Sequence, residues 1–300
     1  MPYQRAHAGS KYTPKPGNLL DQVREVLRYH HYAIRTKKAY VSWILQFIRF
    51  NGTRHPREMG KPEIERFLSH LSMNRNVAAA TQSQALNAIV FLYRDVLDMP
   101  VSDKLAPVKA RKKKRLPTVL ARDEANRLII AMKGTHRLMA KLMYGSGLRL
   151  VEVLRLRVHD LGFGNKQIIV RDGKGNKDRS TLFPELLHKQ VQAHLERVKA
   201  LHEKDLNDGY GEVYLPNALA KKYPNAARSW GWQYAFPSKT LSRDPRSHKT
   251  RRHHSRESGL QKAVRNASLE AKIVKRATCH TLRHSFATCL LEDGVNIRVL

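Results

Sequence analysis

The sequence predicts a mainly α protein with two domains: an N-terminal bundle of about four helices and a second, α+β domain with a small antiparallel sheet. Apolar residues recur every three or four positions through residues 19–97, and no alternating strand pattern precedes residue 100. Two short β-branched segments flank a glycine-rich turn at 172–177, which predicts a hairpin. The chain length of 300 residues fits about two domains.

The first 18 residues are polar and contain Pro14, Pro16 and Gly17, so we expect a flexible lead before the helical domain, 19–100. Four helices are predicted there: residues 19–32, a second capped by Thr36, a third with Pro62 in its first turn, and a fourth capped by Thr81. Their inward faces are expected to carry Leu20, Val23 and Leu27; Tyr40, Trp43, Ile44, Phe47 and Ile48; Ile64, Phe67, Leu68 and Leu71; and Leu86, Ile89, Val90, Tyr93 and Leu97.

Charge points to the partner. There are 56 Lys and Arg residues against 25 Asp and Glu, a formal net charge of +31, which predicts salt-sensitive binding to a polyanion, most simply nucleic acid. A membrane surface is disfavoured, because the sequence has no apolar run of about 18 residues and no basic amphipathic tail. The N-terminus lacks the apolar segment of a signal peptide, and two cysteines make no disulfide framework, so a cytoplasmic location is expected.

A linker, 101–117, is predicted between the domains, and it contains the basic run Lys109–Arg115. A solvated linker or a localisation signal would have the same composition. Its place between two folded segments favours a linker that follows a DNA backbone through Lys112, Lys113 and Lys114.

The second domain, 118–300, alternates helical patterns with the hairpin. Helices are predicted at 123–132, 138–144, about 150–158, 184–204 and 260–271, and strands at 167–171 and 180–183. A last helix starts near Thr278 or Thr281, either of which can cap it. Residues 207–258 are polar, loop-rich and dotted with aromatic side chains.

Four cationic side chains stand out by their positions. His280 and Arg283 share one face at the start of the last helix, where free N–H groups suit a phosphate. Arg149 follows a helix end broken by two glycines, and Lys174 lies at the tip of the hairpin. Each could be an ordinary solvated residue, and Lys177 is an alternative to Lys174.

The order of these residues resembles the catalytic domain of tyrosine recombinases. The matching segments are Gly145–Glu152, Gly173–Arg179 and His280–Thr288, and the helical segment before them resembles the core-binding domain of that family. Residues 205–256 look like the insertion of integron integrases, which insert and excise gene cassettes and use a folded single strand with protruding bases. The segments that carry this closer resemblance are Gly209–Pro216, Lys222–Ala226, Ser229–Pro237, Asp244–Ser247 and Arg251–His254.

The resemblance implies cleavage of a DNA phosphodiester by a tyrosine hydroxyl through a 3′-phosphotyrosine, in the bacterial nucleoid and without cofactor or metal. Arg149 and Arg283 would stabilise charge on the phosphate, Lys174 would protonate the leaving 5′-oxygen, and His280 would assist proton transfer. Glu152 would orient Arg149. Zinc is disfavoured because Cys279, His280, His284 and Cys289 fit no common ligand spacing.

The resemblance also leads us to predict that Trp232, His253 and His254 contact protruding bases, since unpaired bases stack on aromatic and imidazole rings. The alternative is that Trp230, Trp232 and Tyr234 form a small core within the insertion.

The family pattern continues with a Leu-Gly-His-type segment and then the nucleophilic tyrosine, and the sequence ends at Leu300 before both. We therefore expect a C-terminally truncated integron integrase that cannot cleave by itself, and an ordered homotetramer is in doubt. A non-catalytic protein that occupies recombination sites is the alternative, and a basic RNA binder would explain the charge but not the order of the four cations.

Overall fold

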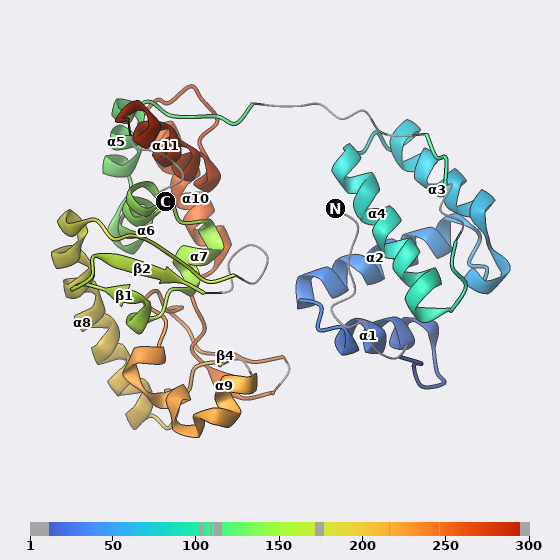
Figure 1. The fold of residues 1–300 in the computed structure, drawn as a ribbon, viewed down its shortest axis with the longest axis horizontal. Coiled ribbons are helices and arrows are strands. Elements are labelled where there is room, and N and C mark those ends of the chain that lie inside the picture. Colours follow the sequence, from blue (N-terminus) through green and yellow to red (C-terminus); the bar gives the residue numbers. More distant parts are fainter. Residues whose placement is uncertain are drawn as a thin grey trace. The chain divides into compact units, whose positions relative to one another are not determined.

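The computed structural model describes residues 12–101, 105–108, 110, 116–171, 177–215, 217–245 and 247–294. The chain divides into two compact units, Met1–Arg115 and Leu116–Leu300, which are described separately below (Figure 1). The first unit is helical among its described residues, and the second combines helices with small antiparallel sheets, so the predicted fold class is confirmed.

The first unit packs α1 (Leu19–Tyr29), α2 (Ile34–Phe50), α3 (Lys61–Met73) and α4 (Ala79–Phe91) around one apolar core, with a 3₁₀ turn η1 (Pro56–Glu58) and a π-helical turn η2 (Leu92–Val96). Pro62 lies in the first turn of α3, as predicted. The predicted caps Thr36 and Thr81 are wrong. Both helices begin earlier, after Ala33 and Ala78, because extended backbone turns into the helix there without a side-chain cap.

Residues 105–108 and Ala110, in the first half of the predicted linker, lie along α3 and α4. Side chains on these helices pair with the linker backbone: Glu65 Oε1 accepts from Ala106 N at 2.7 Å, and Gln82 Nε2 donates to the carbonyl oxygen of Val108 at 2.7 Å. The Gln82 amide also accepts from Ala110 N at 2.9 Å. This stretch therefore packs as part of the first unit.

The second unit has its elements in the following order. Four elements come first: α5 (Arg122–Ala131), α6 (Gly134–Ser146), α7 (Leu150–Arg155) and η3 (Val158–Asp160). They precede a three-stranded sheet of β1 (Leu161–Gly162), β2 (Gln167–Val170) and β3 (Arg179–Leu182). Then follow α8 (Glu185–Asn207), α9 (Asn217–Lys222), η4 (Pro224–Arg228), η5 (Trp230–Trp232), the ribbon β4 (Ser242–Arg243) and β5 (Thr250–Arg251), α10 (Glu257–Glu270) and α11 (Cys279–Glu292).

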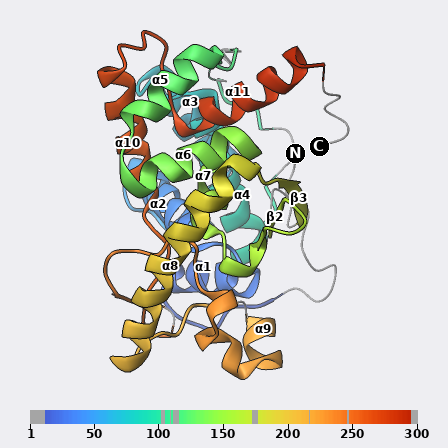
Figure 2. The ribbon, with the colours of Figure 1, turned by 90° about the vertical axis from the view of Figure 1, so that its left-hand side faces the viewer.

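The predicted hairpin is confirmed: β2 and β3 pair antiparallel, with Ile168 opposite Thr181, and β1 extends the sheet on the other side of β2. The sheet and α5–α8, α10 and α11 share one core, whereas the insertion has a smaller cluster around Val213, Leu215 and Tyr234. Within the second unit, α9 and α11 lie at opposite ends (Figures 1 and 2).

The packing of α11 against α6 brings two distant parts of the chain together. Gly147 ends α6 in the left-handed conformation, with φ of 60°, and the ring of Phe286 on α11 would lie only 2.5 Å from a Cβ at this position. Thr278 caps α11, since its hydroxyl accepts a hydrogen bond from Thr281 N at 3.3 Å. The start of α11 therefore lies beside the turn between α6 and α7.

Candidate active site

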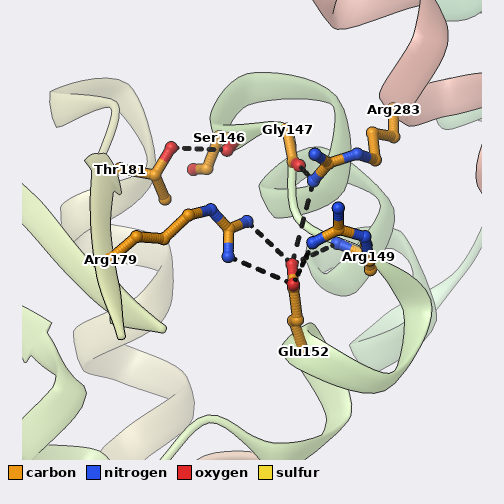
Figure 3. A network of polar contacts seen from close by, with 7 residues as sticks. All are labelled: Ser146, Gly147, Arg149, Glu152, Arg179, Thr181 and Arg283. Atoms are coloured by element: carbon orange, nitrogen blue, oxygen red, sulfur yellow. Dashed lines mark hydrogen bonds and ion pairs between the residues drawn. The ribbon is translucent and has the colours of Figure 1, made fainter. Parts of the chain in front are cut away.

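The candidate site is centred on the carboxylate of Glu152 in the first turn of α7 (Figure 3). Arg149, at the N-cap of that helix, donates from Nη1 to Oε1 at 2.7 Å and from its backbone N–H to Oε2 at 2.8 Å. Arg283 reaches in from α11: its Nη1 lies 3.8 Å from Glu152 Oε2 and donates to the carbonyl oxygen of Gly147. Two cations predicted from distant segments therefore meet at one carboxylate.

A third guanidinium, which sequence reasoning did not assign to the site, belongs to Arg179 on β3. Its Nη1 and Nη2 donate to Glu152 Oε1 and Oε2 at 3.1 and 2.8 Å (Figure 3). The signal in the sequence is the segment Gly173–Arg179, which ends at this residue. The pattern alone could not assign Arg179 to the site, because a shift of one residue in strand register would turn its side chain to the other face of the sheet.

The cluster has excess positive charge. Three guanidinium groups surround one carboxylate, and the side chains of Arg149, Arg179 and Arg283 remain 35%, 30% and 29% exposed, whereas that of Glu152 is 9% exposed. Burial by itself raises the pKa of Glu152, but hydrogen bonds from Arg179 and Arg149 outweigh it and hold this pKa below its usual value. Burial, and then repulsion from Arg149, lowers the pKa of Arg283. Partly exposed guanidinium forks of this kind suit a phosphate.

Of the two other predicted catalytic residues, His280 is among the described residues and Lys174 is not. His280 lies in the first turn of α11, three residues before Arg283, and is exposed. Lys174 lies outside the described residues, although the strands on both sides of its turn are described, and so do Lys112, Lys113 and Lys114 of the linker. Among the described residues, no group of three His, Cys, Asp or Glu side chains is placed to hold a metal.

Trp232 has two environments. Its ring lies 4.4 Å from that of His159, and it packs against the small cluster of Val213, Leu215 and Tyr234. It also lines an open hollow together with Tyr223 and Pro224. Trp230 instead packs against the main core and stacks on His202 at 6.1 Å. Part of the Trp232 side chain thus belongs to the core of the insertion and part borders the hollow.

The rings of His253 and His254 lie against each other, with centroids 4.1 Å apart and planes tilted by 53°, and both lie against the ring of Tyr234, at 5.3 and 5.4 Å. His253 is exposed as a residue, although its ring is partly covered by these neighbours. Partial burial, reinforced by His254 and Arg155, lowers the pKa of His253 to about 4, and burial also lowers the pKa of His254. Both rings are thus neutral at pH 7 and suited to stacking.

Arg157 connects these aromatic groups to the rest of the unit. This residue is 8% exposed, and its guanidinium donates to the carbonyl oxygens of Trp232 and Tyr214 at 2.6 and 2.8 Å. It also lies 4.6 Å from the ring centroid of Tyr234. The insertion is therefore fixed to the end of α7 by a buried cation.

Comparison with known proteins agrees with the fold. Residues 118–300 match the phage integrase family, and residues 19–103 match the phage integrase N-terminal SAM-like domain. The chain therefore belongs to the phage integrase family of tyrosine recombinases, which are site-specific DNA recombinases. An integrase/recombinase of Escherichia coli is 47% identical over 284 residues, covering 94% of this chain and 84% of that protein.

More distant relatives extend the comparison. Tyrosine recombinase XerA of Thermococcus kodakarensis is 28% identical over 291 residues, covering 95% of this chain and 86% of that protein. The fold resembles a lambda integrase tetramer bound to a Holliday junction, with a TM-score of 0.58, 14% identity and coverage of 94% of this chain and 71% of that one. It also resembles XerH site-specific recombinase in a post-cleavage complex with a palindromic difH substrate, with a TM-score of 0.56, 17% identity and coverage of 93% of this chain and 76% of that one. In the part of the chain that the structure describes, no helix is long and apolar enough to cross a membrane.

Proposed function

We propose that residues 1–300 form the DNA-binding and phosphate-activating part of an integron-type integrase, which integrates and excises gene cassettes by cutting and rejoining DNA strands. The observation that carries the proposal is the meeting of Arg149 and Arg283 at Glu152, with more guanidinium groups than carboxylates and with donors still exposed. This arrangement suits a phosphate whose non-bridging oxygens gain charge during displacement.

In the proposed reaction, a tyrosine hydroxyl attacks the phosphorus of a DNA phosphodiester and the bond to the 5′-oxygen breaks. Arg149 and Arg283 bind the two non-bridging oxygens, and Glu152 keeps Arg149 oriented. Lys174 protonates the leaving 5′-oxygen, and His280 assists proton transfer near the nucleophile. The tyrosine follows this motif in the family, so the complete reaction belongs to a polypeptide that carries it.

We further propose that the insertion, 205–256, recognises unpaired bases of a folded single strand. Trp232 beside its open hollow would bind one base, and the His253–His254 pair would stack on another. DNA is the proposed partner, contacted also by Lys112, Lys113 and Lys114 in the linker. Assembly as a homotetramer on DNA would depend on the segment that carries the tyrosine.

The electrophile site can be tested in the chain as it stands, with hydrogen peroxide as a small substitute nucleophile. A peroxide oxygen would attack the phosphorus, the bond to the 5′-oxygen would break, and that oxygen would take a proton. We expect strand cleavage at one phosphodiester of a nicked, folded single strand from a cassette recombination site, and its loss in Arg149→Ala and Arg283→Ala. Salt-sensitive gel retardation without cleavage would favour the alternative, a non-catalytic protein that occupies recombination sites.

Base recognition has a separate test. Replacing His253 and His254 with alanine should weaken binding to the folded single strand by about tenfold, a typical effect of losing one stacked base, and leave binding to the plain duplex of the same site nearly unchanged. An equal loss on both substrates would show that the two histidines do not read protruding bases.

A further inference from the structure

Arg179 holds the Glu152 carboxylate in a way that neither of the other two arginines does. It is the one guanidinium of the three that donates to both carboxylate oxygens through two different nitrogens, in a fork-to-fork arrangement. Arg149 donates to Glu152 from one guanidinium nitrogen, and Arg283 lies at 3.8 Å from the carboxylate. In Figure 3, Arg179 approaches Glu152 from the strand, opposite the side from which Arg149 and Arg283 come.

This geometry affects what Arg149 can do. Arg149 and Glu152 are three residues apart on one helix, so the two side chains can form a closed pair by themselves. If Arg179 were absent, both carboxylate oxygens would be free to take more of the donors of Arg149 and Arg283. A guanidinium that faces a carboxylate with two donors has fewer left to bind a phosphate. The fork of Arg179 therefore limits how many hydrogen-bond donors of Arg149 and Arg283 are taken up by Glu152 and lost to a phosphate.

The strand that carries Arg179 is itself fixed. Two residues further along β3, Thr181 donates from its hydroxyl to the carbonyl oxygen of Ser146 at 2.8 Å, and Ser146 is the last residue of α6. Arg179 and Thr181 point to the same side of the strand because side chains alternate. The guanidinium is therefore held on a rigid element, as is needed to position other side chains closely.

We propose that Arg179 is a positioning residue of the phosphate site: it clamps Glu152 so that Arg149 and Arg283 keep donors available for a phosphate. The proposal rests on the proposed function, because it presupposes that Arg149 and Arg283 bind phosphate. Beyond that function, we expect the two-nitrogen fork of Arg179, and not only its charge, to set the phosphate affinity of the site.

The test uses the whole chain, with inorganic phosphate as the probe and the side-chain Nε–H signals of Arg149 and Arg283 in nitrogen-15 NMR spectra as the readout. Local signals are needed because a chain with a net charge of +31 binds phosphate at other places too. The signals are assigned with Arg149→Lys and Arg283→Lys. The melting temperature of every variant is measured first.

Arg179→Lys is the decisive variant, because it keeps the charge and removes the fork. We expect it to weaken phosphate binding at the two signals by about tenfold, comparable to losing one charge-assisted hydrogen bond. Adding Glu152→Gln to Arg179→Lys should restore most of the affinity, since an amide withdraws the guanidinium groups less. Arg127→Lys, which alters a surface pair with Asp123, is the matched control and should bind phosphate as the unmodified chain does.

A second control separates release of Arg149 from a general gain of positive charge. Glu124→Gln, at a surface pair with Lys275, adds the same charge as Glu152→Gln and should not rescue Arg179→Lys. Three results overturn the proposal while leaving phosphate binding intact: unchanged affinity in Arg179→Lys, no rescue by Glu152→Gln, or equal rescue by Glu124→Gln. If phosphate shifts neither signal in the unmodified chain, the phosphate site itself is wrong, and the role of Arg179 fails with it.

Discussion

Two of the arginine–carboxylate clusters in the second unit, one around Glu152 and one around Asp160, differ in how their guanidinium groups are satisfied. At Glu152, three partly exposed arginines share one carboxylate, so positive charge and donors are in excess. At Asp160, Arg171 pairs with the carboxylate at 2.7 Å. The guanidinium of the buried Arg157 instead donates to two carbonyl oxygens and lies over an aromatic ring.

This difference shows that residue type alone does not distinguish a ligand-binding site from a cluster that only holds segments of the fold together. Both clusters consist of arginines near a carboxylate at the two ends of α7. What distinguishes them is the balance between donors and acceptors and the burial of Arg157, since Arg171 is at least as exposed as the arginines at Glu152. An unsatisfied, partly exposed guanidinium can take a ligand, whereas a fully satisfied, buried one holds segments together.

The largest effect is expected at the open cluster, that is, Glu152 with Arg149, Arg179 and Arg283. Arg283→Ala should lower the rate of DNA cleavage, in the peroxide assay or in a chain that carries the tyrosine, by roughly 10²–10³-fold, as for other lost transition-state donors. Gel retardation should show nearly unchanged DNA affinity, because most binding comes from other cations. Arg127→Ala removes the same charge elsewhere and should cleave normally. If both variants lose the same activity, net charge and not the site explains the effect.

At the closed cluster, that is, Asp160 with Arg157 and Arg171, substitutions should lower the free energy of unfolding and not the cleavage rate. Arg157→Leu leaves the carbonyl oxygens of Trp232 and Tyr214 without their donor and should lower the free energy of unfolding by about 2–4 kcal/mol. Urea denaturation followed by tryptophan fluorescence measures this, since two of the three tryptophans, Trp230 and Trp232, lie in the insertion. Arg171→Leu is the comparison: its side chain is 39% exposed, and a smaller loss is expected. An equal or larger loss of stability in Arg171→Leu would show that Arg157 is not the residue that fixes the insertion.

Gly147 tests how the open cluster depends on the packing of α11. A Cβ there would lie 2.5 Å from Phe286 Cδ1, and the backbone has φ of 60°, so Gly147→Ala should destabilise the chain by about 1–3 kcal/mol. It should also slow cleavage, because the Gly147 carbonyl accepts a hydrogen bond from Arg283. Gly209→Ala has the same kind of backbone, with φ of 80° and open space around the Cβ, and should show only the smaller strain effect.

The smallest expected effect is a response to acid, which should arise at the insertion and not at Glu152. Burial lowers the pKa of His194, whose Nε2 lies 2.8 Å from the carbonyl oxygen of Ala235 in the insertion. Between this lowered pKa and the usual value near 6.5, the unfolded chain binds more protons, so stability falls as pH drops below about 6.5. The pKa of Glu152 is lowered, so its stabilising contribution is fully present above the ordinary carboxyl pKa and is lost only as pH falls below that value.

His194→Gln, which keeps a donor for Ala235 but does not titrate, should reduce the loss of stability between pH 7.5 and 5.5 by about 1 kcal/mol or less. Urea denaturation at the two pH values checks this. An unchanged pH dependence in His194→Gln would show that other groups control the acid response.

Sequence reasoning could identify the helices and the hairpin because their periodicity is local, and it selected Arg149 and Arg283 through the motifs around them. It misplaced the starts of α2 and α4, because Thr36 and Thr81 are good capping residues that lie within the first turns of helices begun by extended backbone. It could not assign Trp230 and Trp232, which lie two residues apart and pack against different clusters.

The amino-acid sequence by itself determined the helical and hairpin elements, the strong positive charge and the residue types available for phosphate chemistry, since these follow from composition and short-range pattern. Only the tertiary structure decided that Arg179 shares Glu152 with Arg149 and Arg283, and that Arg157 is buried. The reason is physical: α7, β3 and α11 meet through tertiary packing, since Arg179 is 27 residues from Glu152 and Arg283 is 136 residues from Gly147. The exposure and partners of each arginine depend on that packing.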